Sequence, residues 1–189
     1  NNPEKRRIVG RVDGHIPPVD IQRRHLFVSP PVHDIAYGDD YIEVVARGVR
    51  ELQARSGEEE VALVCHSMGG LVARAYLVDR GAFDIVRVIT VGSPHRGTRQ
   101  ARLAFARNVA QQRFDSDWLQ RLAARERRED RQLFTVFLSH HDNIVSPQSI
   151  QILPDAEIVE LGGVGHLAML YRRPLWLEIS DRLRRDGWN

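Results

Sequence analysis

The sequence contains little cysteine, little lysine and few aromatic residues, and it has no long hydrophobic run. Its 189 residues include one cysteine, Cys65, which excludes an intrachain disulfide and a cysteine-based zinc site. No apolar run approaches the roughly 20 residues that span a bilayer. The first residues are polar and basic, and no apolar stretch follows them. We therefore expect no stable membrane insertion and no targeting signal in this chain, which leaves the cellular compartment open.

The positive charge of the chain is carried almost entirely by arginine. Lys5 is the single lysine, so 26 of the 27 basic residues are Arg, and the formal net charge is +2. The arginines are dispersed, and the densest run, 121–131, alternates with acidic residues as a solvated helix face does. Only 7% of the residues are aromatic, whereas nucleic-acid binders usually interleave basic and stacking residues. The sequence therefore argues against a nucleic-acid partner and leaves open an arginine-mediated binder of anionic surfaces.

Short apolar segments alternate with segments of helical period along the chain. The apolar segments predict strands at 26–28, 61–65, 85–91, 133–138 and 158–161. Apolar residues at helical spacing predict helices around 42–52, 71–78 and 174–183. Strands that alternate with helices form a mostly parallel sheet flanked by helices, so the predicted fold class is α/β. The length fits one domain over residues 1–189.

Residues 99–131 interrupt this alternation, because they are helical in pattern and contain no predicted strand. An insertion of this size is a lid over a binding site in one interpretation and a helix pair packed on the body in the other. Its apolar residues suit either interpretation, and they include Leu103, Phe105, Val109, Trp118, Leu119 and Leu122.

A serine stands between a predicted strand and a predicted helix in the segment Cys65-His-Ser67-Met-Gly69. This context is that of a nucleophile elbow, in which the serine occupies a sharp turn and the residues two before and two after it must be small. Gly69 meets this requirement, whereas Cys65 stands where the common pattern has glycine. Ser67 is therefore a candidate nucleophile, and the alternative is a glycine-rich turn without catalytic meaning.

Two further candidates follow later strands. Asp142 comes after the strand predicted at 133–138, and His166 comes after the strand predicted at 158–161. Because the carboxyl ends of parallel strands meet at one edge of a sheet, we expect both residues to lie near Ser67. A serine needs a base that takes its proton and an acid that orients this base, and the order Ser, Asp, His is the one typical of this fold. We predict a catalytic triad of these residues.

The other histidines and the cysteine suggest weaker alternatives. His140 and His141, beside Asp142, invite interpretation as a metal site. We disfavour it because adjacent residues on an extended segment point to opposite sides, so we expect no metal. Structural roles are expected for three residues at strand ends, Cys65, His66 and His95.

Four ordered stretches resemble the serine esterases and lipases of the α/β-hydrolase fold, in particular the bacterial triacylglycerol-lipase-like proteins. These stretches are HSMGGLVARAY at 66–76, TVGSPHRGT at 90–98, SHHDNIVSP at 139–147 and GHL at 165–167. The resemblance implies hydrolysis of a carboxylic ester, from a small molecule or a lipid, through an acyl-enzyme and without a cofactor. It implies Ser67 as the nucleophile, His166 as the general base and Asp142 as the orienting acid. The backbone N–H of Met68 is then expected in the oxyanion hole.

The amino-terminal part of the chain departs from this family. Family members begin with an apolar strand that ends in a His-Gly pair, and the following loop donates a second N–H to the oxyanion hole. Residues 1–25 contain no such unit. We therefore expect an atypical or truncated amino terminus, an unidentified second oxyanion donor, and self-association through an uncovered sheet edge. The alternative function is a non-catalytic or weakly active remnant of a hydrolase that needs a partner or the missing strand.

Overall fold

The computed structural model describes residues 25–28, 38–97 and 116–185. Its strands are His25–Val28 (β1), Val61–His66 (β2), Ile85–Val91 (β3), Phe134–Ser139 (β4) and Glu157–Leu161 (β5). Its helices are Gly38–Ser56 (α1), Gly69–Arg80 (α2), Asp117–Arg125 (α4), Arg128–Gln132 (α5) and Arg173–Arg185 (α6), with short 3-10 helices at Gln148–Gln151 (η2) and Leu167–Tyr171 (η3). Every strand and helix that the sequence predicts is present, with the strand ends within one residue of their expected positions and the helices extending up to four residues further.

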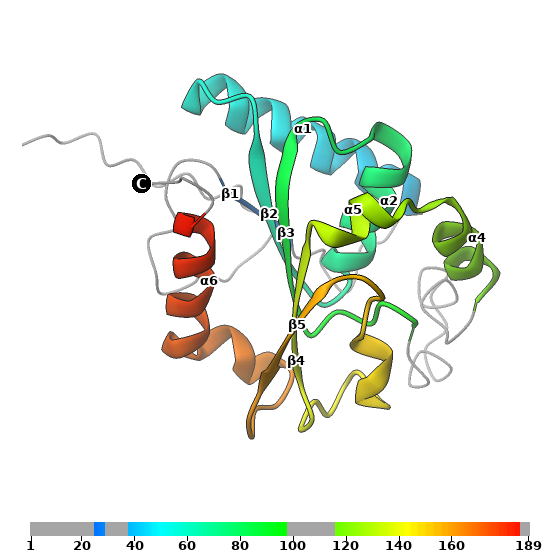
Figure 1. Cartoon of the computed structure of the whole chain (residues 1–189), viewed down its shortest axis with the longest axis vertical. Helices are drawn as coiled ribbons and strands as arrows, with labels where there is room; N and C mark the ends of the chain where they lie inside the picture. The colour runs from blue at the N-terminus through cyan, green and yellow to red at the C-terminus, as the bar shows by residue number, and fades with distance from the viewer. Residues whose placement is uncertain (1–24, 29–37, 98–115, 186–189) are drawn as a thin grey trace, which may run out of the picture.

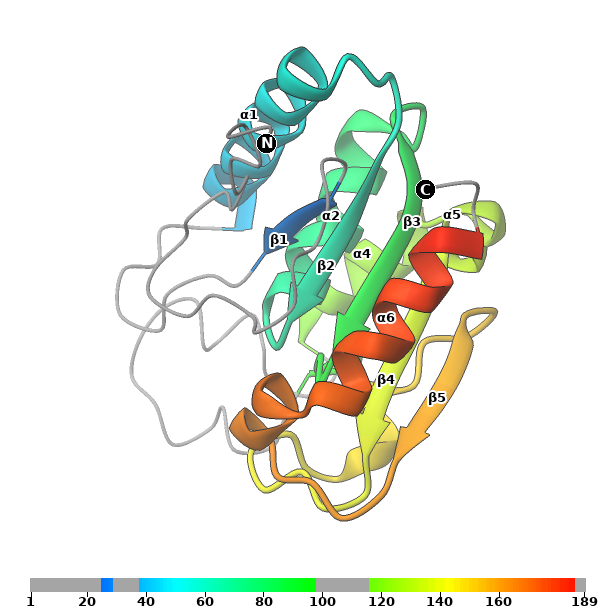
Figure 2. The ribbon, with the colours of Figure 1, turned by 90° about the vertical axis from the view of Figure 1, so that its left-hand side faces the viewer.

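The five strands form one sheet in the order β1-β2-β3-β4-β5, and all four neighbouring pairs are parallel. At its centre, Leu63 of β2 lies beside Val88 of β3. Because each strand pairs in parallel with its neighbour in sequence, all the carboxyl ends lie at the same edge (Figure 2). The predicted α/β class with a parallel sheet is confirmed, and one edge receives the loops that follow β2, β4 and β5.

Helices cover both faces of the sheet (Figure 1). One face carries α1 and α2, together with α4, and the other face carries α6. Side chains alternate along β2, so Leu63 packs in the cluster that contains α1 and α2, whereas Val64 packs in the cluster that contains α6. This burial on both sides explains why β2 is a continuous apolar run in the sequence.

Capping residues explain where two of the helices begin and end. Gly81 ends α2 with a φ of 82°, a value that favours glycine, and donates its N–H to the carbonyl of Leu77. Ser116 precedes α4, and its Oγ accepts a hydrogen bond from the N–H of Leu119 at 3.3 Å. The first bond satisfies a carbonyl of the last turn of α2, and the second satisfies an N–H of the first turn of α4.

The described part of the insertion packs on the body of the domain. Leu122 of α4 is buried in the cluster that contains α1 and α2. The guanidinium of Arg74, in α2, donates two hydrogen bonds to the carboxylate of Glu126 at 2.5 and 2.9 Å, and both side chains are buried. These contacts favour the packed-helix interpretation for residues 116–131. The rest of the insertion lies outside the described residues, and with it Leu103, Phe105 and Val109.

Other expectations concern the ends of the chain and of the sheet. The amino-terminal segment that we predicted to be atypical lies outside the described residues up to position 24. The outer strands of the described sheet are β1 and β5. Among the helices that the structure describes, none combines the length and the apolar character needed to cross a bilayer.

Candidate active site

Ser67 lies in the sharp turn between β2 and α2. Its φ angle of 53° is in the left-handed region, which residues with a side chain rarely adopt. Its backbone N–H donates a hydrogen bond to the carbonyl of Val91, at the end of β3, at 3.0 Å. A backbone strained in this way costs on the order of 1–3 kcal/mol and persists only where the surrounding structure enforces it.

Close packing around Gly69 and Gly70 enforces this turn. A Cβ atom on Gly69 would lie 2.1 Å from the carbonyl oxygen of Val28, and one on Gly70 would lie 2.4 Å from the Oγ of Ser93. Glycine at these positions therefore lets the first turn of α2 approach its neighbours. Cys65 stands where the common elbow pattern has glycine, and its side chain is fully buried in the cluster that contains α1 and α2.

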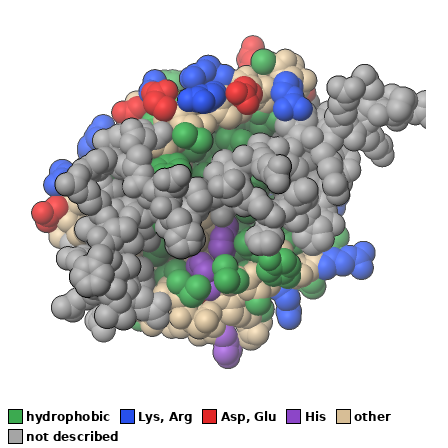
Figure 3. Space-filling model, turned by 180° about the vertical axis from the view of Figure 1, so that it is seen from behind, with side chains coloured by type: hydrophobic (Ala, Val, Ile, Leu, Met, Phe, Trp, Pro, Cys, Tyr) green, Lys and Arg blue, Asp and Glu red, His purple; other side chains and the backbone are tan. Residues whose placement is uncertain are grey.

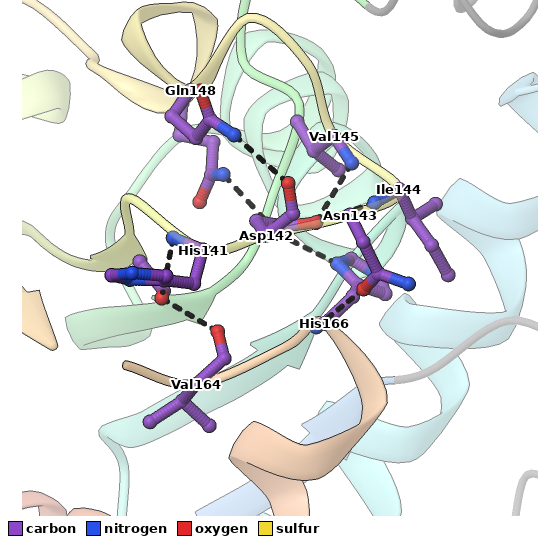
Figure 4. Close-up of polar contacts among 10 residues, drawn as sticks. His141, Asp142, Asn143, Ile144, Val145, Gln148, Val164 and His166 are labelled. Atoms are coloured by element: carbon purple, nitrogen blue, oxygen red, sulfur yellow. Dashed lines mark hydrogen bonds and ion pairs between the residues drawn. The ribbon is translucent and has the colours of Figure 1, made fainter. Parts of the chain in front are cut away.

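Asp142 lies in the turn that follows β4. Its N–H donates to the carbonyl of Ser139 at 3.1 Å, which closes the turn. The Oγ of Ser139 donates to the carbonyl of Val164 at 2.6 Å and so joins the loop after β4 to the loop after β5 (Figure 4). Because the second loop carries His166, this bond brings the predicted acid and the predicted base together.

The carboxylate of Asp142 is buried and accepts hydrogen bonds at both oxygens (Figure 4). Oδ1 accepts from the N–H groups of Ile144 and Val145 at 2.9 and 2.8 Å, and Oδ2 accepts from Nδ1 of His166 at 2.8 Å and Nε2 of Gln151 at 3.2 Å. Burial acts to raise the pKa of Asp142, but the bonds from His166, Val145 and Ile144 outweigh it and hold this pKa below its ordinary value. The side chain is therefore ionised near neutral pH.

His166 lies in the loop after β5 and is held at three points. Its Nδ1 donates to Asp142, and its backbone N–H donates to Oδ1 of Asn143 at 3.2 Å. Gly92 packs against the ring, since a Cβ there would lie 3.1 Å from Nδ1. Because a carboxylate accepts the proton of Nδ1, the neutral ring keeps Nε2 as its basic nitrogen.

The end of β3 brings Ser67 and His166 to one place. Ser67 is hydrogen-bonded to Val91, and the next residue, Gly92, packs against the ring of His166. His66, directly before Ser67, also contacts this ring. Histidine side chains are visible in a hollow beside hydrophobic side chains in Figure 3. The structure thus gathers the three predicted site residues at the ends of β2, β4 and β5, and their catalytic roles stay a prediction.

The other candidates have different environments. Cys65 is fully buried, and burial raises the pKa of its thiol, so it stays protonated near neutral pH. His140 and His141 are exposed, and Nε2 of His140 lies 3.0 Å from Oε2 of Glu160. Our expectation that these two histidines lie on an extended segment is wrong, because His140 and His141 form the turn that follows β4. Within the described residues, no group of three His, Cys, Asp or Glu side chains is arranged to hold a metal.

His95 is buried in the loop after β3. Its Nε2 lies 3.0 Å from Oγ1 of Thr90, and its carbonyl accepts a hydrogen bond from Nη1 of Arg74. Burial, followed by the charge of Arg74, lowers the pKa of His95 well below its ordinary value. The neutral side chain and its carbonyl thus connect this loop to β3 and α2.

Sequence reasoning missed three residues that contact the candidate triad. Gln151 is fully buried and donates to Asp142, and its only sign in the sequence is a polar residue between two isoleucines. Asn143 accepts from the backbone of His166, and only its position next to Asp142 marks it. His66 was expected to be structural, but its ring lies against the predicted base.

Comparison with known proteins agrees with this architecture. The family described as "PGAP1-like alpha/beta domain" matches residues 32–157, a stretch that includes Ser67 and Asp142 and ends before His166. Lipase B of Aspergillus fumigatus is 22% identical, with a TM-score of 0.64 over 78% of this chain and 42% of that chain. The mature lipase BlEst2 of Bacillus licheniformis is 16% identical, with a TM-score of 0.60 over 76% of this chain and 74% of that chain.

A third similar structure, the product of gene lin2722 from Listeria innocua, is 15% identical, with a TM-score of 0.52 over 78% of this chain and 67% of that chain. These likenesses show that the chain has the α/β-hydrolase fold, as its resemblance to the esterases and lipases implied. The chain spans less than half the length of the Aspergillus lipase.

Proposed function

The chain belongs to the family of PGAP1-like alpha/beta domains, and from this premise we propose that it is a serine hydrolase that cleaves carboxylic esters through an acyl-enzyme. One observation carries the proposal: the buried hydrogen bond between His166 and Asp142 lies beside the strained turn of Ser67. A buried imidazole that donates one ring N–H to a carboxylate can use its other nitrogen as a base for a serine at the neighbouring turn, which is how a catalytic triad activates a hydroxyl.

In the first half of the proposed reaction, Oγ of Ser67 attacks the ester carbonyl. Nε2 of His166 takes the hydroxyl proton as the new C–O bond forms, and it then gives this proton to the departing alcohol. The ionised Asp142 holds the proton of Nδ1 and stabilises the imidazolium that forms between these two steps. In the second half, His166 takes a proton from a water molecule as the water oxygen bonds to the acyl carbon. His166 then returns this proton to Oγ of Ser67 as the acyl C–O bond breaks, which releases the carboxylic acid and the free serine.

We assign the negative charge of the tetrahedral intermediate to the amino-terminal end of α2. The N–H of Met68 directly follows the nucleophile, which is the position that supplies an oxyanion donor in a nucleophile elbow. The dipole of α2 also favours a negative charge at this end of the helix. We assign no second donor among the described residues.

Two observations support a small-molecule or lipid ester as the substrate. The Aspergillus and Bacillus structures that resemble this fold are named lipases. In addition, Ile144 and Leu167, the chain neighbours of Asn143 and His166, are large apolar residues with 40% and 60% of their surface exposed. Exposed apolar side chains this close to the base suit an ester with an apolar acyl or alcohol group.

A fluorophosphonate probe tests this proposal, because it reacts covalently only with an activated serine. We expect the purified chain to gain one adduct, located at Ser67 by peptide mapping, and the Ser67→Ala variant to gain none. Ser149→Ala, which removes an exposed serine of η2, is the matched control and should be labelled like the wild type. A folded wild-type chain that is not labelled would contradict the proposal and support the alternative of a non-catalytic remnant.

A further inference from the structure

His66 is the last residue of β2 and directly precedes Ser67 in the chain. Only 5% of its surface is exposed. By the alternation along β2, its side chain shares a face with Ala62 and Val64, which pack in the cluster that contains α6 and Met169 of η3. This placement puts the imidazole of His66 under the loop that carries His166.

Two contacts connect His66 to the predicted base. The ring centroids of His66 and His166 lie 4.8 Å apart, with 43° between the ring planes. The backbone of His166 also lies close enough to the ring of His66 to act on its pKa. Nε2 of His66 is buried and has no hydrogen-bond partner among the described residues. His66 therefore lies against both the ring and the main chain of His166, although it belongs to β2 and His166 to the loop after β5.

The remaining contacts of His166 hold its ring on the Nδ1 side. Asp142 binds Nδ1, Asn143 holds the backbone N–H, and Gly92 packs on the ring next to Nδ1. A ring that is held on one side can still tilt about the Nδ1 hydrogen bond, and such a tilt would move Nε2 relative to Ser67. The ring of His66, packed against that of His166, opposes this movement. Because His66 is covalently joined to Ser67, it links the position of the base to the position of the nucleophile.

We propose that His66 is a positioning residue that holds the ring of His166 at the productive distance from Ser67. This inference rests on the proposed function and deepens it, because it predicts that the acylation rate depends on a residue that takes no part in proton transfer. Positioning of this kind has large effects on rate, since a displacement of about 1 Å can cost on the order of 10²-fold.

The ionisation of His66 suits this role. Burial, followed by the charge of His166, lowers the pKa of His66 to about 4, although the backbone of His166 and the charge of Asp142 act in the opposite direction. His66 is therefore neutral near pH 7. A neutral ring can pack against His166 without repelling the imidazolium that forms during catalysis. The positive charge of a lysine or arginine at this position would repel it.

Single-turnover acylation by p-nitrophenyl butyrate tests the inference. We expect His66→Ala to lower the acylation rate constant by about 10- to 100-fold with little change in KM, because the substrate does not depend on His66 for binding. His66→Phe keeps the ring contact and loses both nitrogens, so it should recover most of the lost rate. His66→Asn keeps a hydrogen-bond donor and loses the ring, so it should stay slow.

His95→Ala is the control for removing a buried histidine that does not contact the base. We expect it to lower the melting temperature without changing the acylation rate constant. The inference is overturned if His66→Ala and His66→Asn acylate at the wild-type rate constant. It is also overturned if these variants show a smaller fraction of active chains but an unchanged rate constant, because the substitution would then affect folding alone. If His66→Ala does not fold, the comparison of His66→Asn with His66→Phe decides in the same way. A wild-type chain without acylation would contradict the proposed function itself, so the two failures are distinct.

Discussion

The turn that carries Ser67 and the loop that carries Asp142 lie at the same edge of the sheet, but different interactions hold them in place. Around Ser67 the constraint is steric, because Gly69 approaches Val28 so closely that a Cβ would lie 2.1 Å from a carbonyl oxygen. Around Asp142 the constraint is polar, because its carboxylate accepts hydrogen bonds from two backbone N–H groups, from Gln151 and from His166.

This difference follows from what each group has to do. A nucleophile must extend from a rigid turn toward substrate, and close packing of the backbone beneath it provides rigidity without covering it. A buried acid must stay ionised, and hydrogen-bond donors provide the required stabilisation. We therefore expect the elbow to be sensitive to added volume and the acid loop to be sensitive to changes in charge and hydrogen bonding.

Asp142→Asn tests the polar half of the site and should have the largest effect. The amide keeps the size of the side chain, but it has no charge to stabilise the imidazolium and can hold His166 in the wrong tautomer. We expect kcat for p-nitrophenyl butyrate to fall on the order of 10⁴-fold. Asp155→Asn, which removes a carboxylate paired with Arg131 away from the site, is the control and should keep kcat. A loss of less than tenfold in Asp142→Asn would contradict the assigned role.

The sequence predicted which three residues gather at this edge of the sheet better than it predicted the contacts that hold them there. Ser67, Asp142 and His166 could be found because each follows an apolar strand, and parallel strands bring their carboxyl ends to one edge. The contacts of Gln151 and His66 could not be found in the same way, because they depend on how two loops fold over each other. The close approach of Gly69 to Val28 likewise depends on the pairing of β1 with β2, which hydrophobic pattern alone does not fix.

Gly69→Ala tests the steric half. Its added methyl group would meet the carbonyl oxygen of Val28 at 2.1 Å, and backbone cannot move aside as a flexible side chain can. We expect the free energy of unfolding to decrease by about 3 kcal/mol, as measured by urea denaturation. Helix propensity alone would predict the opposite, a gain in stability, because alanine is favoured over glycine in a helix.

Gly162→Ala is the matched control for this substitution. Among the described residues other than its two chain neighbours, no heavy atom lies within 4 Å of a Cβ built on Gly162, so the same methyl group should change stability by less than about 0.5 kcal/mol. If Gly69→Ala unfolded at the urea concentration of the wild type, packing would not be what shapes the elbow.

The pH dependence of stability tests His66, which connects the two halves. Burial lowers its pKa from 6.5 to about 4, so between these values the unfolded chain binds a proton that the folded chain does not. Stability should therefore fall as pH decreases from 6.5 to about 4, by on the order of 3 kcal/mol from this group. Urea unfolding at pH 7.0 and at about pH 4.5 measures this decrease. In His66→Phe the decrease should be smaller by the part that His66 contributes. An unchanged decrease in the variant would show that His66 does not titrate as its burial requires.

In the proposed reaction, Ser67 carries the acyl group of an ester during turnover. Rapid mixing with p-nitrophenyl butyrate, followed by an acid quench and mass spectrometry of peptides, measures this directly. We expect release of one p-nitrophenolate per chain in the first turnover and a butyryl group on the peptide that contains Ser67. Hydrolysis without this adduct, or hydrolysis that persists in Ser67→Ala, would contradict it.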